Sequence, residues 1–171
     1  MAIDQAFTVK GVGLVAVGHV QSGKVNKHDE LILAGSEGNA IARSLQVMDL
    51  DVEVANVGDR VGLAMRTAGP FREDLLGKGS VLADSNERFT VETKSKFDLD
   101  KAAFQKNDLA AGDVVHLCSD VQFVVGRISE VSDCVHIEWD FPIVLNKSST
   151  RNPLIVQLEA NPRIMGFAKF K

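Results

Sequence analysis

The residues most able to bind a metal occur in two mirrored pairs, His116-x-Cys118 and Cys134-x-His136. Residues two positions apart point to the same face of a β-strand, so two antiparallel strands carrying these pairs could build a Cys2His2 zinc site. The spacings differ from those of zinc modules, and alternate strand positions also suit packed thiols and hydrogen-bonded histidines. We therefore predict no metal in this chain.

A glycine-rich segment, Gly11-Val12-Gly13-Leu14-Val15-Ala16, formally matches the G-x-G-x-x-A signature of dinucleotide-binding folds. That signature needs a helix to begin after the second glycine, so that its N-terminus faces the pyrophosphate. Here the residues that follow, through Val20, continue a strand. Gly11, Gly13 and Gly18 instead indicate a bulge or a close approach of two backbones. The segment Gly77-Lys78-Gly79-Ser80 has the wrong spacing for a phosphate loop, so we expect no GTP hydrolysis by this chain alone.

Carboxylates alternate at Asp49, Asp51 and Glu53, which is typical of a solvated strand face and leaves a cation site as the alternative. No serine or cysteine stands beside a base that a third group would orient, and no pair of carboxylates stands out for acid–base work. The side chains themselves therefore do not indicate an enzyme.

Short β-rich runs separated by turn signals must position all of these residues. Several runs alternate apolar with polar side chains, as half-buried strands do. The expected strands are Leu14–Val20, Glu30–Ala34, Ala40–Val47, Arg60–Met65, Val114–Cys118, Val121–Ser129, Val135–Phe141, Leu154–Leu158 and Arg163–Lys171. Helix is scarce, with one turn expected at Arg72–Leu76 and two turns at Asp98–Gln105, where Asp98 would be the N-cap.

Many strands without crossover helices predict an all-β fold of two tandem antiparallel β-barrels, because closure removes exposed sheet edges. The polar stretch 83–87 lies between two strand-like segments and is the expected linker. It gives domains at 1–84 and 85–171, each large enough for a modest core.

Composition narrows the class of protein further. Hydrophobic residues make up 45% and charged residues 25%, and the net charge of −4 argues against indiscriminate binding to nucleic acid. No apolar run approaches the roughly 20 residues that span a bilayer, and the N-terminus lacks the pattern of a signal peptide. Two cysteines are too few for a disulfide framework. We expect a cytoplasmic protein with free thiols and no membrane partner.

Three segments of the first half carry a family resemblance. The stretch IDQAFTVKGVGLVAVGHVQSGKV followed by DELIL resembles the opening of the second domain of elongation factor Tu and, more closely, of the selenocysteine-specific elongation factor. DVEVANVGDRVGLAMR and DLLGKGSVLAD resemble later segments of the same domain, with Lys78 where arginine is usual. In the second half, FTVETKSKF, AGDVVHL and NPRIMGFAKFK resemble the third domain by order and spacing. The chain looks like domains 2 and 3 of an elongation-factor-Tu-like translational GTPase, most similar to the selenocysteine-specific elongation factor or an archaeal paralogue of it.

The resemblance implies a pocket for the aminoacyl ester and terminal adenosine of a tRNA. By motif position the pocket residues are Asp4, Gln5, Phe7, Val17, Gln46 and Arg60. Asp4 would accept hydrogen bonds from an α-ammonium group, Phe7 and Val17 would form apolar walls, and Gln46 would pack along a base. Arg60 offers a guanidinium to an ester, a phosphate or a side-chain anion. Alternatively, Asp4 and Arg60 are a surface ion pair, and Phe7 and Val17 are ordinary packing residues.

One departure bears on specificity, because the selenocysteine factor has arginine at the position of Gln5, where it helps to hold a selenolate. The neutral Gln5 leads to the hypothesis that the pocket takes a neutral or different amino acid, or that the substrate is no longer a selenocysteinyl-tRNA.

The resemblance implies a module that binds the acceptor end of an aminoacyl-tRNA and is not itself an enzyme or a cofactor-binding protein. The complete factor would add a GTPase domain with GTP and magnesium, and would act on the ribosome. The alternative is a protein-interaction module that docks a GTPase domain or another partner and no longer binds tRNA.

Overall fold

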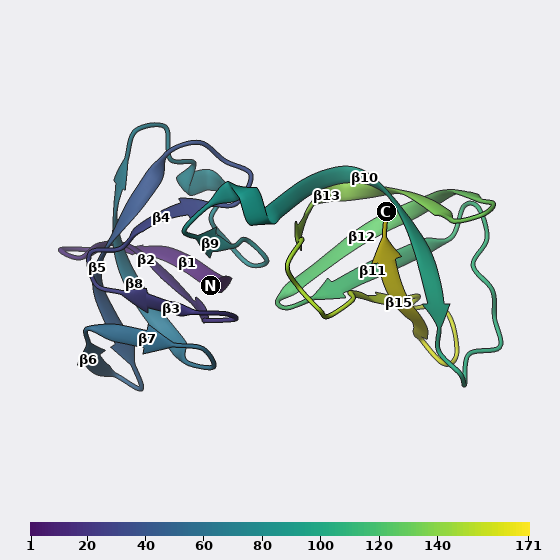
Figure 1. Ribbon diagram of the computed structural model, residues 1–171, viewed down its shortest axis with the longest axis horizontal. Helices are drawn as coiled ribbons and strands as arrows, with labels where there is room; N and C mark the ends of the chain where they lie inside the picture. The colour runs from purple at the N-terminus through teal and green to yellow at the C-terminus, as the bar shows by residue number, and fades with distance from the viewer. The chain divides into compact units, whose positions relative to one another are not determined.

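The computed structural model describes every residue from Met1 to Lys171 and divides into two compact units, Met1–Thr90 and Val91–Lys171. Nearly all regular structure is β-strand, which confirms the predicted all-β class (Figure 1). The helical content is limited to two 3-10 turns, η1 (Glu73–Leu75) and η2 (Asn86–Arg88). No helix in the chain has the length and hydropathy that crossing a lipid bilayer requires.

The strands of the first unit are short and mostly antiparallel neighbours. They are β1 (Ala2–Val9), β2 (Gly13–His19), β3 (Lys24–Asn26), β4 (Glu30–Leu33), β5 (Asn39–Val47), β6 (Leu50–Val52), β7 (Val54–Asn56), β8 (Arg60–Ala68) and β9 (Leu82–Ala83). The main sheet has the order β1-β2-β8-β5-β4-β9, with β6 paired to β5, and β3 pairs with β7 in a separate ribbon.

The two edges of this sheet, β1 and β9, meet through irregular pairing instead of a full ladder. An isolated bridge joins Ala2 to Val81, the Ile3 amide donates to the Ser80 carbonyl at 2.9 Å, and the Leu82 amide donates to the Met1 carbonyl at 2.9 Å. These bonds satisfy backbone groups that an open edge would leave exposed. The first unit is thus a barrel-like sheet that closes over only a few residues.

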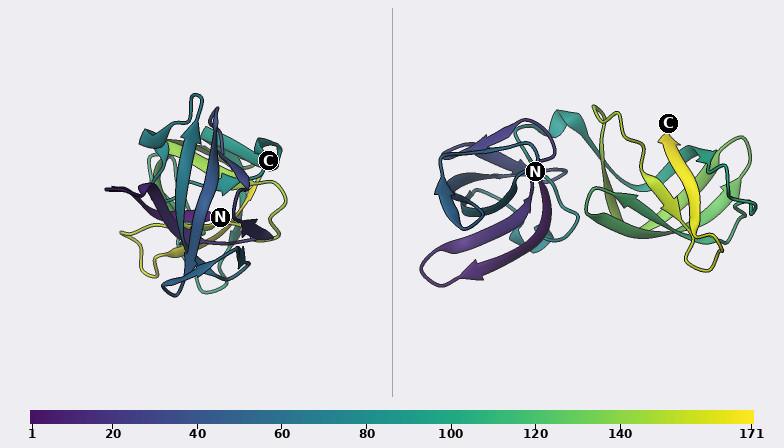
Figure 2. Two further views of the ribbon diagram at one scale, coloured as in Figure 1. Left: turned by 90° about the vertical axis from the view of Figure 1, so that its left-hand side faces the viewer. Right: turned by 90° about the horizontal axis from the view of Figure 1, so that it is seen from below.

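Gly18 shows why a glycine is needed between β1 and β2. A Cβ at Gly18 would lie 2.1 Å from the Ala2 carbonyl oxygen, so the two backbones approach too closely for any side chain. Gly11 and Gly13 have φ of 83° and 102° and form the β1–β2 turn, at the free end of the hairpin in Figure 2. The expected close approach is confirmed, and β2 continues as a strand where a dinucleotide motif would start a helix.

The second unit is a closed barrel with the order β10-β13-β12-β11-β14-β15. Its strands are β10 (Phe89–Lys101), β11 (Val114–Ser119), β12 (Gln122–Val131), β13 (Val135–Asn146), β14 (Leu154–Val156) and β15 (Ile164–Phe170). The core inside the barrel includes Phe97, Leu117, Ile137, Ile155 and Met165, all of which are almost fully buried. Each of these side chains comes from a different strand, as barrel closure requires.

The prediction of two helical turns at Asp98–Gln105 is wrong, because β10 continues through Lys101. Phe97 is buried, Asp98 is exposed, Leu99 packs against the core and Asp100 is exposed, which is a strand alternation. Two ion pairs between the paired strands β10 and β15 hold these carboxylates on the outside of the barrel. They are Lys171–Asp98 at 2.9 Å and Lys169–Asp100 at 3.0 Å. Reading Asp98 as a helix cap missed this pairing because its partners are some 70 residues further along the chain.

The expected linker at 83–87 is tied to the first unit. Asn86 Oδ1 accepts from the Gly35 amide at 2.9 Å, and its Nδ2 donates to the Ser36 carbonyl at 3.1 Å. Ser85 Oγ accepts from the Glu87 amide and caps η2. These bonds explain why the compact first unit extends to Thr90.

Candidate functional site

Four aligned positions form a row across the outer face of the first sheet. Gln5 on β1 lies opposite Val17 on β2, Val17 opposite Gly62 on β8, and Gly62 opposite Gln46 on β5. Directly opposite residues share one sheet face. The side chains next to them in sequence, including Ala16, Leu63 and Leu45, are fully buried in the core. The row therefore faces outward, and three of the six predicted site residues stand on it.

A second row runs beside the first, two residues further along each strand. Phe7 pairs with Val15, Val15 with Ala64, and Ala64 with Ser44. Phe7 is 45% exposed although it is apolar, whereas Val15 and Ala64 are partly or largely covered. The centre of this face consists of Gly62 and Ala64, which carry almost no side chain, and Phe7 stands above it at the β1 side.

Gly62 leaves open space above the sheet. A Cβ built there would meet nothing closer than Gln46, at 4.0 Å from its Cβ and carbonyl oxygen. Gly62 differs from Gly18 in this respect, because no neighbouring backbone comes close enough to exclude a side chain at Gly62. A missing side chain in mid-strand often marks the place where another molecule approaches the backbone.

Asp4 and Arg60 lie beside the first row, on the side away from Phe7. A register shift between Ile3 and Gln5 makes Asp4 the extra residue of a β-bulge, which turns its side chain toward the outer face. Arg60 on β8 lies opposite His19 on β2, and its Nη2 donates to Asp4 Oδ2 at 3.4 Å across β2. The side chains are 58% and 31% exposed, so the ion pair contributes less than about 1 kcal/mol to folding.

Gln46 is the last residue of the first row and lies in the β5–β6 hairpin. Its Nε2 donates to Asp51 Oδ1 at 2.9 Å, and Asp51 is the residue directly opposite Gln46. This bond orients the amide and leaves the Gln46 carbonyl oxygen available as an acceptor. Both partners are exposed.

The structure brings all six predicted residues to one outer face, on the neighbouring strands β1, β2, β8 and β5. Sequence reasoning missed Val15, Ser44, Gly62 and Ala64, which complete the two rows, and His19, which lies directly opposite Arg60 on β2. Period-two alternation indicates that each of these side chains shares a face with the residues two positions away in the same strand. Which strands then stand side by side, and in which register, is not encoded in any local pattern.

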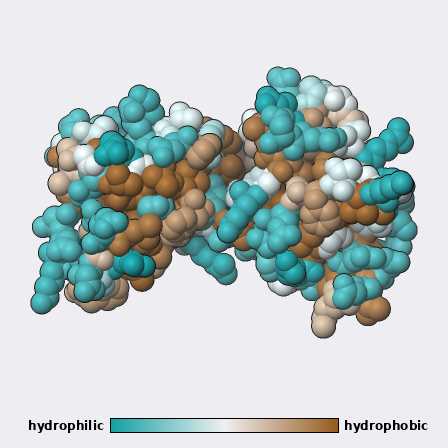
Figure 3. Space-filling view, turned by 180° about the vertical axis from the view of Figure 1, so that it is seen from behind, coloured by the Kyte–Doolittle hydropathy of each residue, from teal (hydrophilic) through white to brown (hydrophobic).

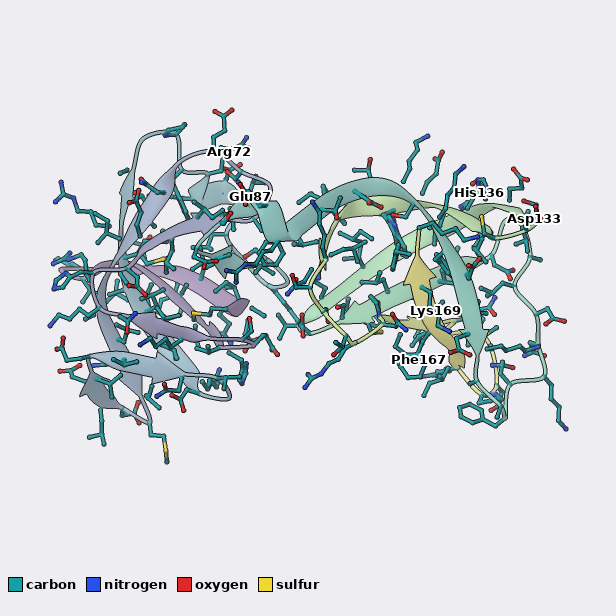
Figure 4. All side chains as sticks on the ribbon, in the orientation of Figure 1. Arg72, Glu87, Asp133, His136, Phe167 and Lys169 are labelled. Atoms are coloured by element: carbon teal, nitrogen blue, oxygen red, sulfur yellow. The ribbon has the colours of Figure 1, made fainter.

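The mirrored cysteine and histidine pairs do not meet. Strand β12 lies between β11, which carries His116 and Cys118, and β13, which follows Cys134 and carries His136. His136 stands near Asp133 at the β12–β13 turn (Figure 4). No group of three or more histidine, cysteine or acidic side chains in the chain could hold a metal ion. Asp51 and Glu53 of the acidic alternation instead pair with Gln46 and Lys27.

The second barrel has an apolar row on its own outer face. Phe123 lies opposite Cys118, Cys118 opposite Leu154, and Leu154 opposite Phe167, on four neighbouring strands. Phe123 and Phe167 are about half exposed, and Figure 3 shows apolar side chains among polar ones on the molecular surface. Phe167 and Lys169 lie on the same strand, β15, in Figure 4. Burial raises the pKa of the Cys118 thiol, so this cysteine is not an activated nucleophile.

His116 lies beside this row and is almost completely buried. Its ring stacks on Phe123 with centroids 4.6 Å apart, and its Nδ1 has no hydrogen-bond partner. The ring therefore packs against Phe123 in the cover of the barrel.

Comparison with protein-family models finds no match. Among curated proteins, the chain is 32% identical to the selenocysteine-specific elongation factor of Escherichia coli over 168 residues, covering 90% of this chain and 25% of that protein. It is 35% identical over 94 residues to the selenocysteine-specific elongation factor of Methanocaldococcus jannaschii, covering 55% of this chain and 19% of that protein. An uncharacterized protein of the same archaeon, MJ0325, is 32% identical over 130 residues, covering 76% of this chain and 41% of that protein. The chain thus spans less than half the length of these relatives.

Solved structures show the same fold. The apo form of translation elongation factor SelB from Methanococcus maripaludis superposes with a TM-score of 0.77 at 22% identity, covering 100% of this chain and 42% of that one. A bacterial selenocysteine-specific elongation factor gives a TM-score of 0.73 at 18% identity, covering 98% of this chain and 27% of that one. The predicted arrangement of two tandem β-barrel domains is therefore confirmed at the level of the fold.

Proposed function

We infer that this chain, which is homologous to the two-barrel segment of selenocysteine-specific elongation factors, binds the aminoacylated 3′ end of a tRNA on the outer face of its first unit. The matched segment lies outside the GTPase domain of those factors, so this chain is not itself an enzyme. One observation carries the proposal. The six residues implied by motif position come from four separate strands and lie together on one open face.

The face offers complementary chemistry for an aminoacyl-adenosine. Asp4 accepts hydrogen bonds from the α-ammonium group, and Arg60 donates to the ester carbonyl from the same end of the face. Phe7 and Val17 pack against the ribose and the base. Gly62, directly opposite Val17, has no side chain and so leaves room for the ligand. The Gln46 carbonyl oxygen, held by the bond from its amide to Asp51, accepts from an exocyclic amine.

The aminoacyl side chain is neutral in this proposal. Gln5 carries no charge, and the Arg60 guanidinium is already paired with Asp4 at 3.4 Å. An anionic side chain would have to compete with that carboxylate for Arg60 and would find no second cation at Gln5. A neutral side chain leaves the ion pair in place, which favours amino acids such as serine over acidic ones.

The complete factor would carry a GTPase domain that holds GTP and magnesium and would act on the ribosome. The apolar row Phe123–Cys118–Leu154–Phe167 of the second barrel supports a contact with that domain, because covering it would remove two half-exposed phenylalanines from water. The net charge of −4 agrees with recognition that is local to the acceptor end.

The test compares binding of total tRNA, aminoacylated against deacylated, in a filter-binding assay at moderate salt. We expect the charged pool to bind more tightly and Arg60→Ala to remove most of that preference. Arg72→Ala is the matched control, because Arg72 is equally exposed but pairs with Asp74 away from this face. Equal binding of both pools would contradict the proposal and support a protein-interaction module instead.

A further inference from the structure

Two arginines lie next to the proposed adenosine site and are not part of the pocket described above. Arg66 on β8 lies opposite Ile41 on β5, two residues beyond Ala64 and on the same outward face. Arg43 is the extra residue at the register shift between Ala42 and Ser44. Strand geometry places this third row about 7 Å beyond the Phe7 row.

The Arg43 side chain lies across the sheet. Its Nη1 donates to the Val12 carbonyl at 3.2 Å, although Val12 belongs to the β1–β2 turn and Arg43 to β5. Strands β8 and β2 lie between them, so the chain from Cα to guanidinium must run over the outer surface of β8. This bond uses one of five N–H donors, and the remaining face of the guanidinium stays open to solvent.

Neither guanidinium is paired with a carboxylate. The nearest acidic side chain by register is Glu30 on β4, which lies opposite Ile41 and is separated from Arg66 by β5. Diagonal neighbours on a sheet stand roughly 7–8 Å apart, so Arg43 and Arg66 repel each other without a counter-ion. Two such cations on an exposed face form a site for an anion with several oxygens.

The opposite end of the same face is acidic. Asp49 stands at the tip of the β5–β6 hairpin and Asp51 pairs with Gln46. The charge along the face therefore changes from negative beside Gln46 to positive beside Ser44. An RNA backbone that starts from an adenosine over the first two rows is repelled at one end and attracted at the other.

We propose that Arg43 and Arg66 bind the phosphate on the 5′ side of the terminal adenosine, and so fix the direction in which the acceptor strand leaves the site. The inference rests on the proposed function, since it takes the adenosine to lie over the Phe7 and Gln5 rows. It adds a phosphate subsite whose contacts are independent of the amino acid. Recognition then has two parts, an aminoacyl end at Asp4 and Arg60 and a backbone anchor at Arg43 and Arg66.

The experiment uses two probes that differ by one phosphate. A stable 3′-aminoacylamido-adenosine is prepared with a 5′-hydroxyl or a 5′-phosphate, and each is titrated into the chain by NMR. The unmodified chain should bind the phosphorylated probe roughly 10-fold more tightly, as a charge-assisted contact to phosphate predicts. Arg43→Gln and Arg66→Gln should each reduce the ratio of the two affinities, 5′-phosphate probe over 5′-hydroxyl probe, toward one. The affinity for the 5′-hydroxyl probe should stay unchanged.

Two control variants distinguish a specific phosphate contact from a general effect of positive charge. Lys24→Gln removes the same charge from β3, outside this face, and should leave the ratio unchanged. Arg43→Lys keeps the charge but loses the planar fork, and should retain part of the ratio. Equal affinity of the unmodified chain for both probes would overturn the subsite while leaving the proposed function intact. Failure of both probes to bind would overturn the two proposals together.

Discussion

Gly62 and Gly18 provide a paired test of the site, because both glycines stand inside the neighbouring strands β8 and β2, Gly62 on the outer face and Gly18 on the inner face, and they differ in what surrounds them. An added Cβ at Gly62 meets only Gln46, at 4.0 Å, which is ordinary contact. An added Cβ at Gly18 lies 2.1 Å from the Ala2 carbonyl oxygen and 3.0 Å from the Ile3 Cα, and both contacts are backbone atoms that cannot rotate away.

The two alanine substitutions should therefore act on different properties. Gly62→Ala should leave the free energy of unfolding unchanged or raise it by about 0.5–1 kcal/mol, because alanine in a strand interior loses less backbone entropy than glycine. The new methyl group occupies the floor between Val17 and Gln46, and overpacking of about 1–3 kcal/mol should weaken binding of aminoacyl-tRNA roughly 5- to 150-fold. Gly18→Ala should destabilise the first unit by about 3 kcal/mol.

The assays are scanning calorimetry and filter binding on the same preparations. Gly18→Ala should lower the melting temperature of the first unit by about 12–24 °C, whereas Gly62→Ala should melt at or above the temperature of the unmodified chain. A Gly62→Ala protein that binds aminoacyl-tRNA with unchanged affinity would refute the placement of the ligand over this face. A Gly62→Ala protein that melts early would refute the claim of open space.

Three further predictions follow from the structure. Gln5→Arg adds a second cation beside Arg60 and should raise the affinity for aspartyl relative to seryl ends by about 10-fold in competition filter binding; an unchanged ratio would count against the position of Gln5 in the site. Gln122→Ala should lower the free energy of unfolding by about 2–3 kcal/mol in urea titrations, because the buried Gln122 amide bonds both the carbonyl and the N–H of Val144 at 2.8 Å; a loss below about 0.5 kcal/mol would show that water replaces the amide. Burial raises the pKa of the Cys118 thiol, so its alkylation by iodoacetamide at pH 8 should be slower than that of a solvated thiol and should accelerate only at higher pH; equal rates in mass spectrometry would show that the outer row of the second barrel opens in solution.

Much of the fold follows from local patterns in the sequence. The run that begins at Val135 alternates apolar and polar side chains, and the runs that begin at Glu30, Arg60 and Val135 all form strands where expected. The short turn at Arg72–Leu76 is present as η1. Local patterns succeed here because period-two burial on a sheet is a property of each strand alone.

Local patterns failed where a distant partner decides the structure. Asp98 resembles a helix cap, yet it pairs with Lys171 across β10 and β15. The cysteine and histidine pairs look convergent, yet β12 separates their strands. In both cases the deciding contact joins residues that no window of the sequence contains.

The sequence by itself determined the all-β class, the tandem barrels and, through family resemblance, the identity of Asp4, Gln5, Phe7, Val17, Gln46 and Arg60 as candidates. Only the tertiary structure decided that these residues share one outer face, that Gly62 forms its open floor, and that Arg43 extends over β8 to the β1–β2 turn. The physical reason is that strand order, register and bulges are set by pairing between distant segments. A single-residue shift at either bulge, beside Asp4 or at Arg43, would turn these side chains to the opposite face.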